Sequence, residues 1–393
     1  MVSNPLYPRL LAPPRGSFFL FGPRGTGKST WLRTTFPDAR TFDLLDEALY
    51  QSLLADIGRF AGELRTLPRG TVVVVDEVQR IPPLLNEVHR HIEDRGLRFV
   101  LCGSSARRLK TAGTNLLAGR AVRRSMHPLL PEELGRDFEL ESVLRWGSLP
   151  VVWSAPDRGE ALAAYAQLYL KEEVQAEALV RNLPGFARFL PVAALFHGQV
   201  VNIAGIARDA GVARTTIAGY LAILEDTMLA FTLPAFETRL RVRERKHPKL
   251  YWADPGIPRA MKRQVGPVAV EERGRLFEGW IASVLRAYRD YGNLFDEWFY
   301  WAPGKGSDVE VDFLLRKGKD IVAIEVKSSG NVRDGDLRGL RALGELPGVR
   351  RRVVVHAGDR RMATADGIEI LPVPSFLRDA GRGTIFTAPP PAR

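Results

Sequence analysis

One short stretch constrains this chain more than any other: GPRGTGKS at residues 22–29, which directly follows the apolar run FFLF. The spacing G-x-x-x-x-G-K-S is typical of a phosphate-binding loop between a buried strand and a helix. Its glycines let consecutive N–H groups point at phosphate oxygens, while Lys28 is expected to reach the β- and γ-phosphates and Ser29 to ligate Mg²⁺. We therefore predict that the chain binds ATP or GTP. The expected nucleotide-binding residues are Gly22, Gly25, Thr26, Gly27, Lys28, Ser29 and Thr30.

A second motif, TVVVVDE at residues 71–77, predicts a strand that ends in two carboxylates. Five β-branched residues in a row indicate a strand buried on both faces, as in a parallel sheet under helices. Open α/β sheets bind ligands at the carboxyl ends of their strands. We therefore expect Asp76 to hold Mg²⁺ and Glu77 to polarise the attacking water. The alternative is an exposed Asp-Glu turn with no role in catalysis.

Further along, the chain offers candidates for contacts with the γ-phosphate. An apolar strand expected over residues 97–102 is followed by Ser104 and Ser105, and Ser104 is the preferred phosphate sensor. Arg120 is the candidate arginine finger that reaches the nucleotide of a neighbouring subunit. A surface arginine is the alternative. The competing arginines are Arg107, Arg123 and Arg124.

Together these motifs resemble the AAA+ ATPases of bacteria and archaea that carry a C-terminal domain of unknown function (type 4143). The resemblance rests on GPRGTGKST, VVVVDEVQ, LCGSSAR and LLAGR, and it continues through WGSLP at residues 146–150 to the end of the chain. It implies an ATPase that uses ATP and Mg²⁺. It also implies assembly into homo-oligomeric rings, with a hexamer as one form.

Composition sets the broad class. A length of 393 residues predicts two or three domains, and 45% hydrophobic and 26% charged residues are ordinary for a globular protein. No stretch approaches the roughly 20 apolar residues that span a bilayer, and the first residues lack a signal-peptide layout. We therefore expect a cytoplasmic protein with no membrane partner. The single cysteine, Cys102, excludes an internal disulfide framework and is expected to be a small buried filler.

The expected fold class is α/β with several parts. We predict an AAA+ core with a parallel sheet over residues 1–130 and a helical lid over 131–185. A winged helix-turn-helix is expected over 186–250, and a nuclease-like α/β domain over 251–393.

The winged-helix segment is the candidate DNA-binding region. Small and apolar residues around Gly211 fit a helix-turn-helix, and the net charge of +11 favours a polyanion partner. Alternate arginines after residue 238 lie on one face of an extended strand. A structural hairpin and a solvated edge strand are the alternatives. The candidate DNA-binding residues are Arg214, Thr215, Thr216, Arg239, Arg241, Arg243, Arg245 and Lys246.

The last third of the chain holds a second acidic set. Asp308, Glu310 and Asp312 alternate along an expected strand, and a following strand ends in Glu325-Val326-Lys327. This order resembles the PD-(D/E)XK nuclease core. The resemblance implies that Asp312 and Glu325 hold Mg²⁺ or Mn²⁺, that Lys327 orients water, and that Glu278 adds a carboxylate. A nuclease-like fold kept for structure or for clamping DNA is the alternative.

These motifs predict an ATP-dependent DNA-binding protein. The first hypothesis is a ring-forming DNA motor or remodeller, similar to helicases or branch-migration proteins, with a metal-dependent nuclease domain. The alternative is a nucleotide-gated switch whose C-terminal domain only clamps DNA or a protein.

Overall fold

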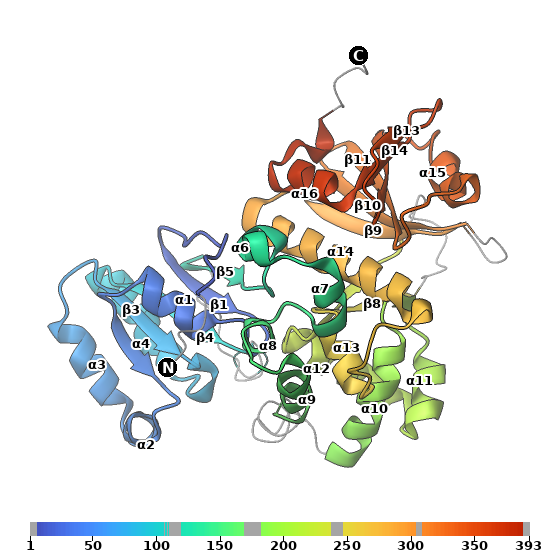
Figure 1. The fold of residues 1–393 in the computed structure, drawn as a ribbon. Helices are drawn as coiled ribbons and strands as arrows, with labels where there is room; N and C mark the ends of the chain where they lie inside the picture. The colour runs from blue at the N-terminus through green and yellow to red at the C-terminus, as the bar shows by residue number, and fades with distance from the viewer. Residues whose placement is uncertain are drawn as a thin grey trace. The chain divides into compact units, whose positions relative to one another are not determined.

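The computed structural model of this chain describes residues 6–105, 107, 109, 119–168, 182–236, 247–303 and 309–387. Within these ranges the chain forms two compact units (Figure 1). The first unit draws its described residues from 1–138, 148–181 and 219–229, and the second from 139–147, 182–218 and 230–393. The division into four domains stays a prediction. Among the described residues, no helix is both long and apolar enough to cross a membrane.

The first unit is built on a parallel five-stranded sheet in the order β2-β3-β4-β1-β5. Its strands are β1 (Ser17–Phe21), β2 (Arg40–Asp43), β3 (Val72–Asp76), β4 (Arg98–Gly103) and β5 (Ala121–Ser125). The three central strands, β3, β4 and β1, are apolar and buried almost throughout, as strands covered by helices on both faces must be. This confirms the α/β fold class predicted from the sequence.

Helices and short turns connect these strands or follow β5. They are α1 (Lys28–Thr35), α2 (Glu47–Ala55), α3 (Ile57–Thr66), α4 (Leu84–Arg95), α6 (Pro131–Leu134), α8 (Pro150–Trp153), α9 (Arg158–Leu168) and the 3-10 turns η1 (Val78–Arg80) and η2 (Gly135–Asp137). The pattern of residues 48–67 predicts one helix, which is wrong. Asp56 ends α2 and its carboxylate accepts from the backbone N–H of Gly58 at 2.8 Å, so the side chain caps α3 and divides the segment.

Two helices joined by a tight turn, α11 (Ile203–Ala210) and α12 (Arg214–Asp226), lie where the sequence predicts a helix-turn-helix. α11 ends at Gly211, which takes the left-handed φ of 64°, and the N–H of Val212 returns to the carbonyl of Ala207 at 3.0 Å. Helix α12 begins three residues later, and its residues from Gly219 onward group with the first unit. The elements of this part are α7 (Leu140–Trp146), α10 (Leu183–Leu195), β6 (Gln199–Val200), α11 (Ile203–Ala210), α12 (Arg214–Asp226), β7 (Ala230–Leu233), β8 (Lys249–Trp252) and α13 (Gly256–Met261).

Strands β6, β8 and β7 form a small antiparallel sheet beside these helices, with β8 in the middle. The β7–β8 pair fits the predicted wing, whose connection spans residues 234–248. The predicted DNA-binding residues in that connection lie outside the described residues. They are Arg239, Arg241, Arg243, Arg245 and Lys246.

A six-stranded mixed sheet forms the rest of the second unit, in the order β13-β14-β12-β11-β10-β9. The long helix α14 (Val270–Gly292) packs along this sheet and also contacts α16 (Val373–Gly381), and α15 (Arg338–Ala342) packs on β11 (Asp320–Lys327) (Figure 1). The predicted strand over 308–315 instead begins at Val311, so Glu310 precedes it; Asp308 lies outside the described residues. The elements are α14 (Val270–Gly292), β9 (Glu297–Trp301), β10 (Val311–Lys317), β11 (Asp320–Lys327), η4 (Asp334–Leu337), α15 (Arg338–Ala342), β12 (Val349–His356), β13 (Met362–Ala363), β14 (Glu369–Pro372), α16 (Val373–Gly381) and η5 (Thr384–Phe386).

Candidate functional site

The loop between β1 and α1 presents the predicted phosphate-binding residues in one tight turn. Gly25 and Gly27 take positive φ angles of 79° and 82°, a conformation that side chains with a Cβ rarely adopt. Thr26 is fully buried, and its hydroxyl closes the turn by donating to the carbonyl of Pro23 at 2.8 Å. Because α1 begins at Lys28, its first N–H groups face the loop. The turn therefore offers backbone donors suited to a phosphate chain.

The Lys28 side chain folds back over this loop. Its ammonium Nζ donates to the carbonyl oxygens of Gly22 at 2.8 Å and Pro23 at 3.1 Å, and the residue is only 7% exposed. Both partners are neutral, so these two hydrogen bonds leave the positive charge uncompensated. A phosphate oxygen is a stronger partner for an ammonium than a carbonyl, because the hydrogen bond is then assisted by charge on both sides.

The predicted magnesium ligands lie next to each other. The Ser29 hydroxyl donates to Oδ2 of Asp76 at 2.6 Å, which brings the start of α1 to the end of β3. Oδ1 of the same carboxylate accepts from the backbone N–H of Glu77 at 3.0 Å. Mg²⁺ commonly binds through one or two protein oxygens and completes its shell with water and phosphate oxygens. Ser29 and Asp76 fit that role.

Glu77 occupies a constrained position directly after β3. It is one of four described non-glycine residues with a positive φ, at 57°, and it starts the 3-10 turn η1. Its half-buried carboxylate accepts a hydrogen bond from Nε2 of Gln79. A left-handed conformation at a residue other than glycine costs on the order of 1 kcal/mol, so the surrounding contacts hold the turn in place.

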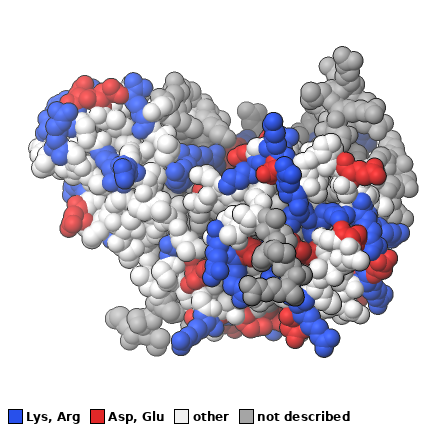
Figure 2. Space-filling view, turned by 90° about the horizontal axis from the view of Figure 1, so that it is seen from above, with Lys and Arg blue, Asp and Glu red and all other residues white. Residues whose placement is uncertain are grey.

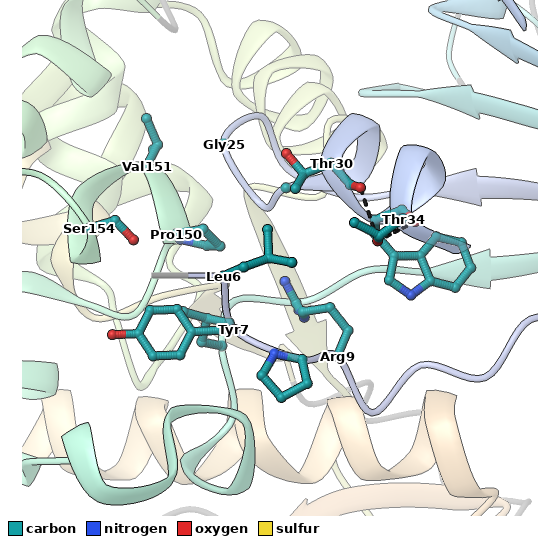
Figure 3. A pocket seen from close by; sticks show the side chains of 13 residues that line it. Leu6, Tyr7, Arg9, Gly25, Thr30, Thr34, Pro150, Val151 and Ser154 are labelled. Carbon is teal, nitrogen blue, oxygen red and sulfur yellow. Dashed lines mark hydrogen bonds between the residues drawn. The ribbon is translucent and has the colours of Figure 1, made fainter. Parts of the chain in front are cut away.

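A pocket of about 370 Å³ opens beside the phosphate loop, between residues of α1 and residues of α8 (Figure 3). Its apolar lining consists of Leu6, Pro8, Trp31, Leu129, Pro150 and Val151. Gly25, Gly27 and Thr30 also line it, so the pocket is continuous with the loop. A flat base attached to phosphates on the loop can therefore enter a mostly apolar cavity. The sequence did not reveal this pocket, because its walls come from four separate segments.

The predicted sensor and finger residues have distinct surroundings. Ser104 is 3% exposed, and its hydroxyl lies 3.4 Å from Nε2 of Gln79. Ser105 instead accepts from the backbone N–H of Arg107 at 3.1 Å. Arg120 forms an ion pair with Glu93, and Arg107 pairs with Asp226 at 2.8 Å. Which arginine acts as a finger stays a prediction.

The second unit brings together the acidic residues predicted for a nuclease site. Asp312 on β10 and Glu325 on β11 are both 8% exposed, and Lys327 lies 2.9 Å from Oε1 of Glu325. Asp312 also accepts from the backbone N–H of Val326 at 2.8 Å. Burial, reinforced by Glu278 and Glu325, raises the pKa of Asp312 well above its usual range. Burial raises the pKa of Glu325 to about 7 although Lys327 opposes the shift.

A lysine that the sequence did not indicate stands within this cluster. Nζ of Lys249 on β8 lies 2.9 Å from Oε1 of Glu278 and 3.5 Å from Oδ1 of Asp312, and it also pairs with Glu310. Burial works to lower the pKa of Lys249, but these carboxylates outweigh it and raise the pKa well above the usual value. The available signal was a lone lysine in the apolar strand KLYW, since a buried lysine needs an acidic partner.

The ammonium of Lys249 lies among the carboxylates where the predicted metal would bind. Across the ranges that the structure describes, no group of three or more His, Cys, Asp and Glu side chains is arranged to hold a metal ion. The arrangement of Glu278, Asp312 and Glu325 therefore does not fit a divalent ion, because a cationic side chain already serves two of these carboxylates.

The candidate DNA-binding residues on α12 are accessible. Arg214 and Thr215 at the start of the helix are exposed, and Thr216 is half-buried. On the face drawn in Figure 2, Lys and Arg side chains are interspersed with Asp and Glu side chains. On this face the basic side chains are therefore mixed with acidic ones.

Models of three protein families match successive parts of the chain. Residues 15–135, which hold the parallel sheet and the phosphate loop, match an AAA domain. Residues 137–267 match the domain of unknown function DUF8612, and residues 273–376 match the domain of unknown function DUF4143. The chain combines an AAA domain with a DUF4143 domain. This confirms the resemblance predicted from the motifs; the nuclease resemblance stays a prediction.

Relatives of this AAA-domain chain include two mycobacterial proteins, the uncharacterized proteins Rv2008c of Mycobacterium tuberculosis and Mb2031c of Mycobacterium bovis. Each is 26% identical over 371 residues, which cover 91% of this chain and 80% of the relative. The similarity therefore extends well beyond residues 15–135, the part of the chain that matches the AAA domain.

Solved structures with some likeness include the Aeropyrum pernix ORC1 protein in complex with DNA, at 12% identity and a TM-score of 0.27, covering 63% of this chain and 86% of that one. The replication initiator DnaA bound to AMPPCP and single-stranded DNA has 14% identity and a TM-score of 0.27, covering 55% and 83%. Protein VC1899 from Vibrio cholerae has 14% identity and a TM-score of 0.23, covering 94% and 96%. These scores are too low to support conclusions about this chain.

Proposed function

We propose that the AAA domain of this chain binds and hydrolyses ATP with Mg²⁺. The observation that carries the proposal is the contact between Ser29 and Asp76, at 2.6 Å, directly beside a loop with Lys28 at its edge. This contact links the start of α1, which follows the phosphate loop, to the end of β3, which carries Asp76 and is followed by Glu77. Mg²⁺, when bound, offsets the negative charge of the phosphates.

The base pocket favours ATP over GTP. Guanine presents N–H donors that are best met by a carboxylate, and no Asp or Glu is among the described residues that line the pocket. The apolar walls suit the face of either purine. Competition by GTP for bound ATP measures this preference.

Each group in the site has a separate task. In this proposal Lys28 and the loop N–H groups hold the β- and γ-phosphates, and Ser104 contacts the γ-phosphate. Glu77 orients a water for attack and accepts its proton. Arg120 of a neighbouring copy in a ring would stabilise the charge that develops on the phosphate.

Substitutions separate binding from hydrolysis. Lys28→Ala should weaken ATP binding, whereas Glu77→Gln should leave binding intact and trap ATP. Arg24→Ala is the control, because Arg24 is exposed and occupies a variable position of the loop. If Glu77→Gln turned over ATP at the wild-type rate, Glu77 would not be the base.

We further propose that ATP hydrolysis drives DNA binding or movement by the second unit. The support is the exposed start of α12 after a tight turn, which is the part of a helix-turn-helix that contacts DNA. Arg214→Ala should weaken duplex binding and lower the salt slope by about one. Arg65→Ala, which removes an exposed arginine from α3, is the charge-matched control.

The arginine-rich connection between β7 and β8 can be tested in the same assay. Changing Arg239, Arg241 and Arg243 to Ala should weaken binding similarly for all DNA sequences and flatten its salt dependence. An unchanged affinity and salt slope would indicate a solvated edge strand instead.

A nucleotide-gated switch is the second candidate function. It is favoured by one observation: the ammonium of Lys249 already neutralises part of the carboxylate cluster, as expected of a domain that clamps a partner without cutting it. Measuring ATP turnover with single-stranded, duplex and branched DNA distinguishes this switch from a DNA motor. A ring-forming motor hydrolyses many ATP per bound DNA, and a switch about one per cycle. Cleavage of the same DNA in Mg²⁺ or Mn²⁺ would support the predicted nuclease.

A further inference from the structure

Gln79 is a buried polar residue of the first unit that has no role in the ATP hydrolysis proposed so far. It is fully buried, two residues after Glu77, and a buried amide is normally satisfied by hydrogen bonds. Its Nε2 donates to Oε2 of Glu77 and lies 3.4 Å from the hydroxyl oxygen of Ser104. One amide NH₂ group carries two N–H donors, so it can serve both acceptors at once. Gln79 therefore joins the candidate base to the candidate phosphate sensor.

The turn that carries Gln79 is held from several sides. The N–H of Arg80 returns to the carbonyl of Glu77 at 2.9 Å, which fixes the left-handed start of η1. The Arg80 guanidinium lies 4.0 Å from the centre of the Tyr50 ring and donates to the carbonyl of Leu44. The Gln79 backbone consequently has little freedom, and its side chain reaches the site from a fixed position.

The end of β4 is shaped to accept this amide. A Cβ added to Gly103 would lie 2.3 Å from Oε1 of Gln79, closer than real Cβ contacts come. Gly103 directly precedes Ser104, so the close approach places the amide beside the sensor hydroxyl. Any side chain at Gly103 would push the Gln79 amide away from Ser104.

We propose that Gln79 is a positioning residue that couples Ser104 to Glu77. This rests on the proposed ATP hydrolysis. Gln79 shares its two donors between a hydroxyl and a carboxylate. A γ-phosphate oxygen that engages the Ser104 hydroxyl changes the hydrogen bonding of that hydroxyl with Gln79. The amide responds, and the Glu77 carboxylate turns toward the attacking water only when the terminal phosphate is present.

The first test removes the donors and separates turnover from binding. Gln79→Leu should lower kcat by about tenfold to a hundredfold while leaving KM within about twofold, because Gln79 is not expected to touch the nucleotide. Gln51→Leu is the matched control, since Gln51 donates to Glu47 at 2.7 Å in the same kind of amide–carboxylate contact on exposed α2. A wild-type kcat for Gln79→Leu, or a loss confined to KM, overturns the proposal.

The second test measures the coupling itself. In a double-mutant cycle, Gln79→Leu and Ser104→Ala should be strongly non-additive, with the double variant about as slow as the slower single variant. Losses in kcat that multiply independently overturn the proposed coupling.

A near-isosteric variant protects the result against a folding defect. Gln79→Glu keeps the shape of the side chain but replaces the donors with a carboxylate, so it should lose about as much kcat as Gln79→Leu. If Gln79→Leu fails to fold, Gln79→Glu decides, and a wild-type kcat in that variant contradicts a donor role. Turnover by the wild-type chain together with full activity of these variants overturns only the role of Gln79. Absence of ATP turnover in the wild-type chain overturns both proposals.

Discussion

The phosphate loop of the first unit and the carboxylate cluster of the second each place a buried lysine beside acidic residues, but the two lysines have opposite surroundings. Lys28 is held by two neutral carbonyls, and the nearby Asp76 carboxylate is occupied by Ser29 and the backbone. Lys249 is instead surrounded by carboxyl groups, with Glu278, Glu310 and Asp312 all within ion-pair distance.

This difference shows how a buried cation can be either available to a ligand or already neutralised by the fold. A lysine bonded only to carbonyls retains its attraction for an anion, since no opposite charge cancels it. A lysine among carboxylates is already paired with opposite charge, and removing it would leave uncompensated buried charge. The first arrangement suits a ligand that arrives with its own negative charge. The second suits a fold that must hold acidic strands together.

The largest expected effect is on stability. Lys249→Met should lower the free energy of unfolding by about 3–5 kcal/mol, because buried carboxylates lose their cation. Chemical denaturation of the full chain measures the loss. Lys317→Met, which replaces an exposed lysine on β10, is the control and should change stability by less than about 0.5 kcal/mol. Equal effects at both lysines would remove the distinction between a neutralised buried cation and a surface cation.

Lys28→Met should show the converse behaviour. ATP affinity is expected to fall by about a hundredfold or more, as for the loss of a charge-assisted contact of about 3 kcal/mol. The loss of stability should be smaller than that expected at Lys249, because the partners left behind are neutral carbonyls rather than carboxylates. Titration with a labelled ATP analogue gives the affinity, and denaturation without nucleotide gives the stability. A large loss of stability would mean that Lys28 holds its unit together in the way that we expect of Lys249.

Divalent ions test whether the ammonium of Lys249 already occupies the position that a metal ion would take. Millimolar Mn²⁺ should leave the unfolding midpoint of the wild-type second unit unchanged. The same Mn²⁺ should stabilise Lys249→Met by about 1–3 kcal/mol, since an ion that binds only the folded state shifts the equilibrium. The double variant Lys249→Met, Asp312→Asn should lose this response. Stabilisation of the wild-type chain by Mn²⁺ that is lost in Asp312→Asn would instead support the predicted metal site.

The smallest expected effect is a pH dependence of stability that comes from His197. Its Nδ1 accepts a hydrogen bond from the backbone N–H of Trp252, and Trp252 lies on β8 together with Lys249. Burial, with Lys262 and Arg275 nearby, lowers the pKa of His197 to about 3 from its usual 6.5. Its contribution to stability is therefore complete above about pH 6.5 and is lost as the pH falls toward 3, by up to about 1.4 kcal/mol per pH unit.

The variant His197→Asn keeps an acceptor for the Trp252 N–H but does not titrate in this range. Urea denaturation at pH 7 and pH 5.5 should show a smaller acid loss for the variant than for the wild type. Identical losses would mean that His197 is protonated in the folded protein.

The sequence predicted most of the residues of the proposed nucleotide site because they lie in short local motifs. A phosphate loop needs glycines, a lysine and a hydroxyl at fixed spacing, and a strand of valines places Asp76 at a sheet edge. Both motifs are contiguous, and the adjacent order of β4 and β1 in the sheet brings Ser104 near the loop. The base pocket was not predictable in the same way, since Leu6 and Val151 meet only through the fold.

The carboxylate cluster was only half predicted for the same reason. Alternation along the strands correctly placed Asp312 and Glu325 on neighbouring strands. Lys249 comes from β8, more than 60 residues earlier in the chain, where its sequence context resembles a strand end. Neither hydrophobic periodicity nor motif spacing reports a contact at that separation. The break at Asp56 was missed because the hydrophobic pattern continues through it, while one side-chain hydrogen bond divides the helix.

Cys102, the single cysteine, gives the first unit a natural chemical reporter. It is fully buried on β4, and burial together with the nearby Asp76 raises the pKa of its thiol. A thiol reagent can therefore modify it only when the central sheet opens. With no other cysteine to react, the rate of labelling reads out the opening of that sheet directly. A nucleotide that tightens the loop between β1 and α1 should slow the labelling of Cys102. The labelling rate therefore reports how often the central sheet opens, although the reagent does not contact the proposed nucleotide site.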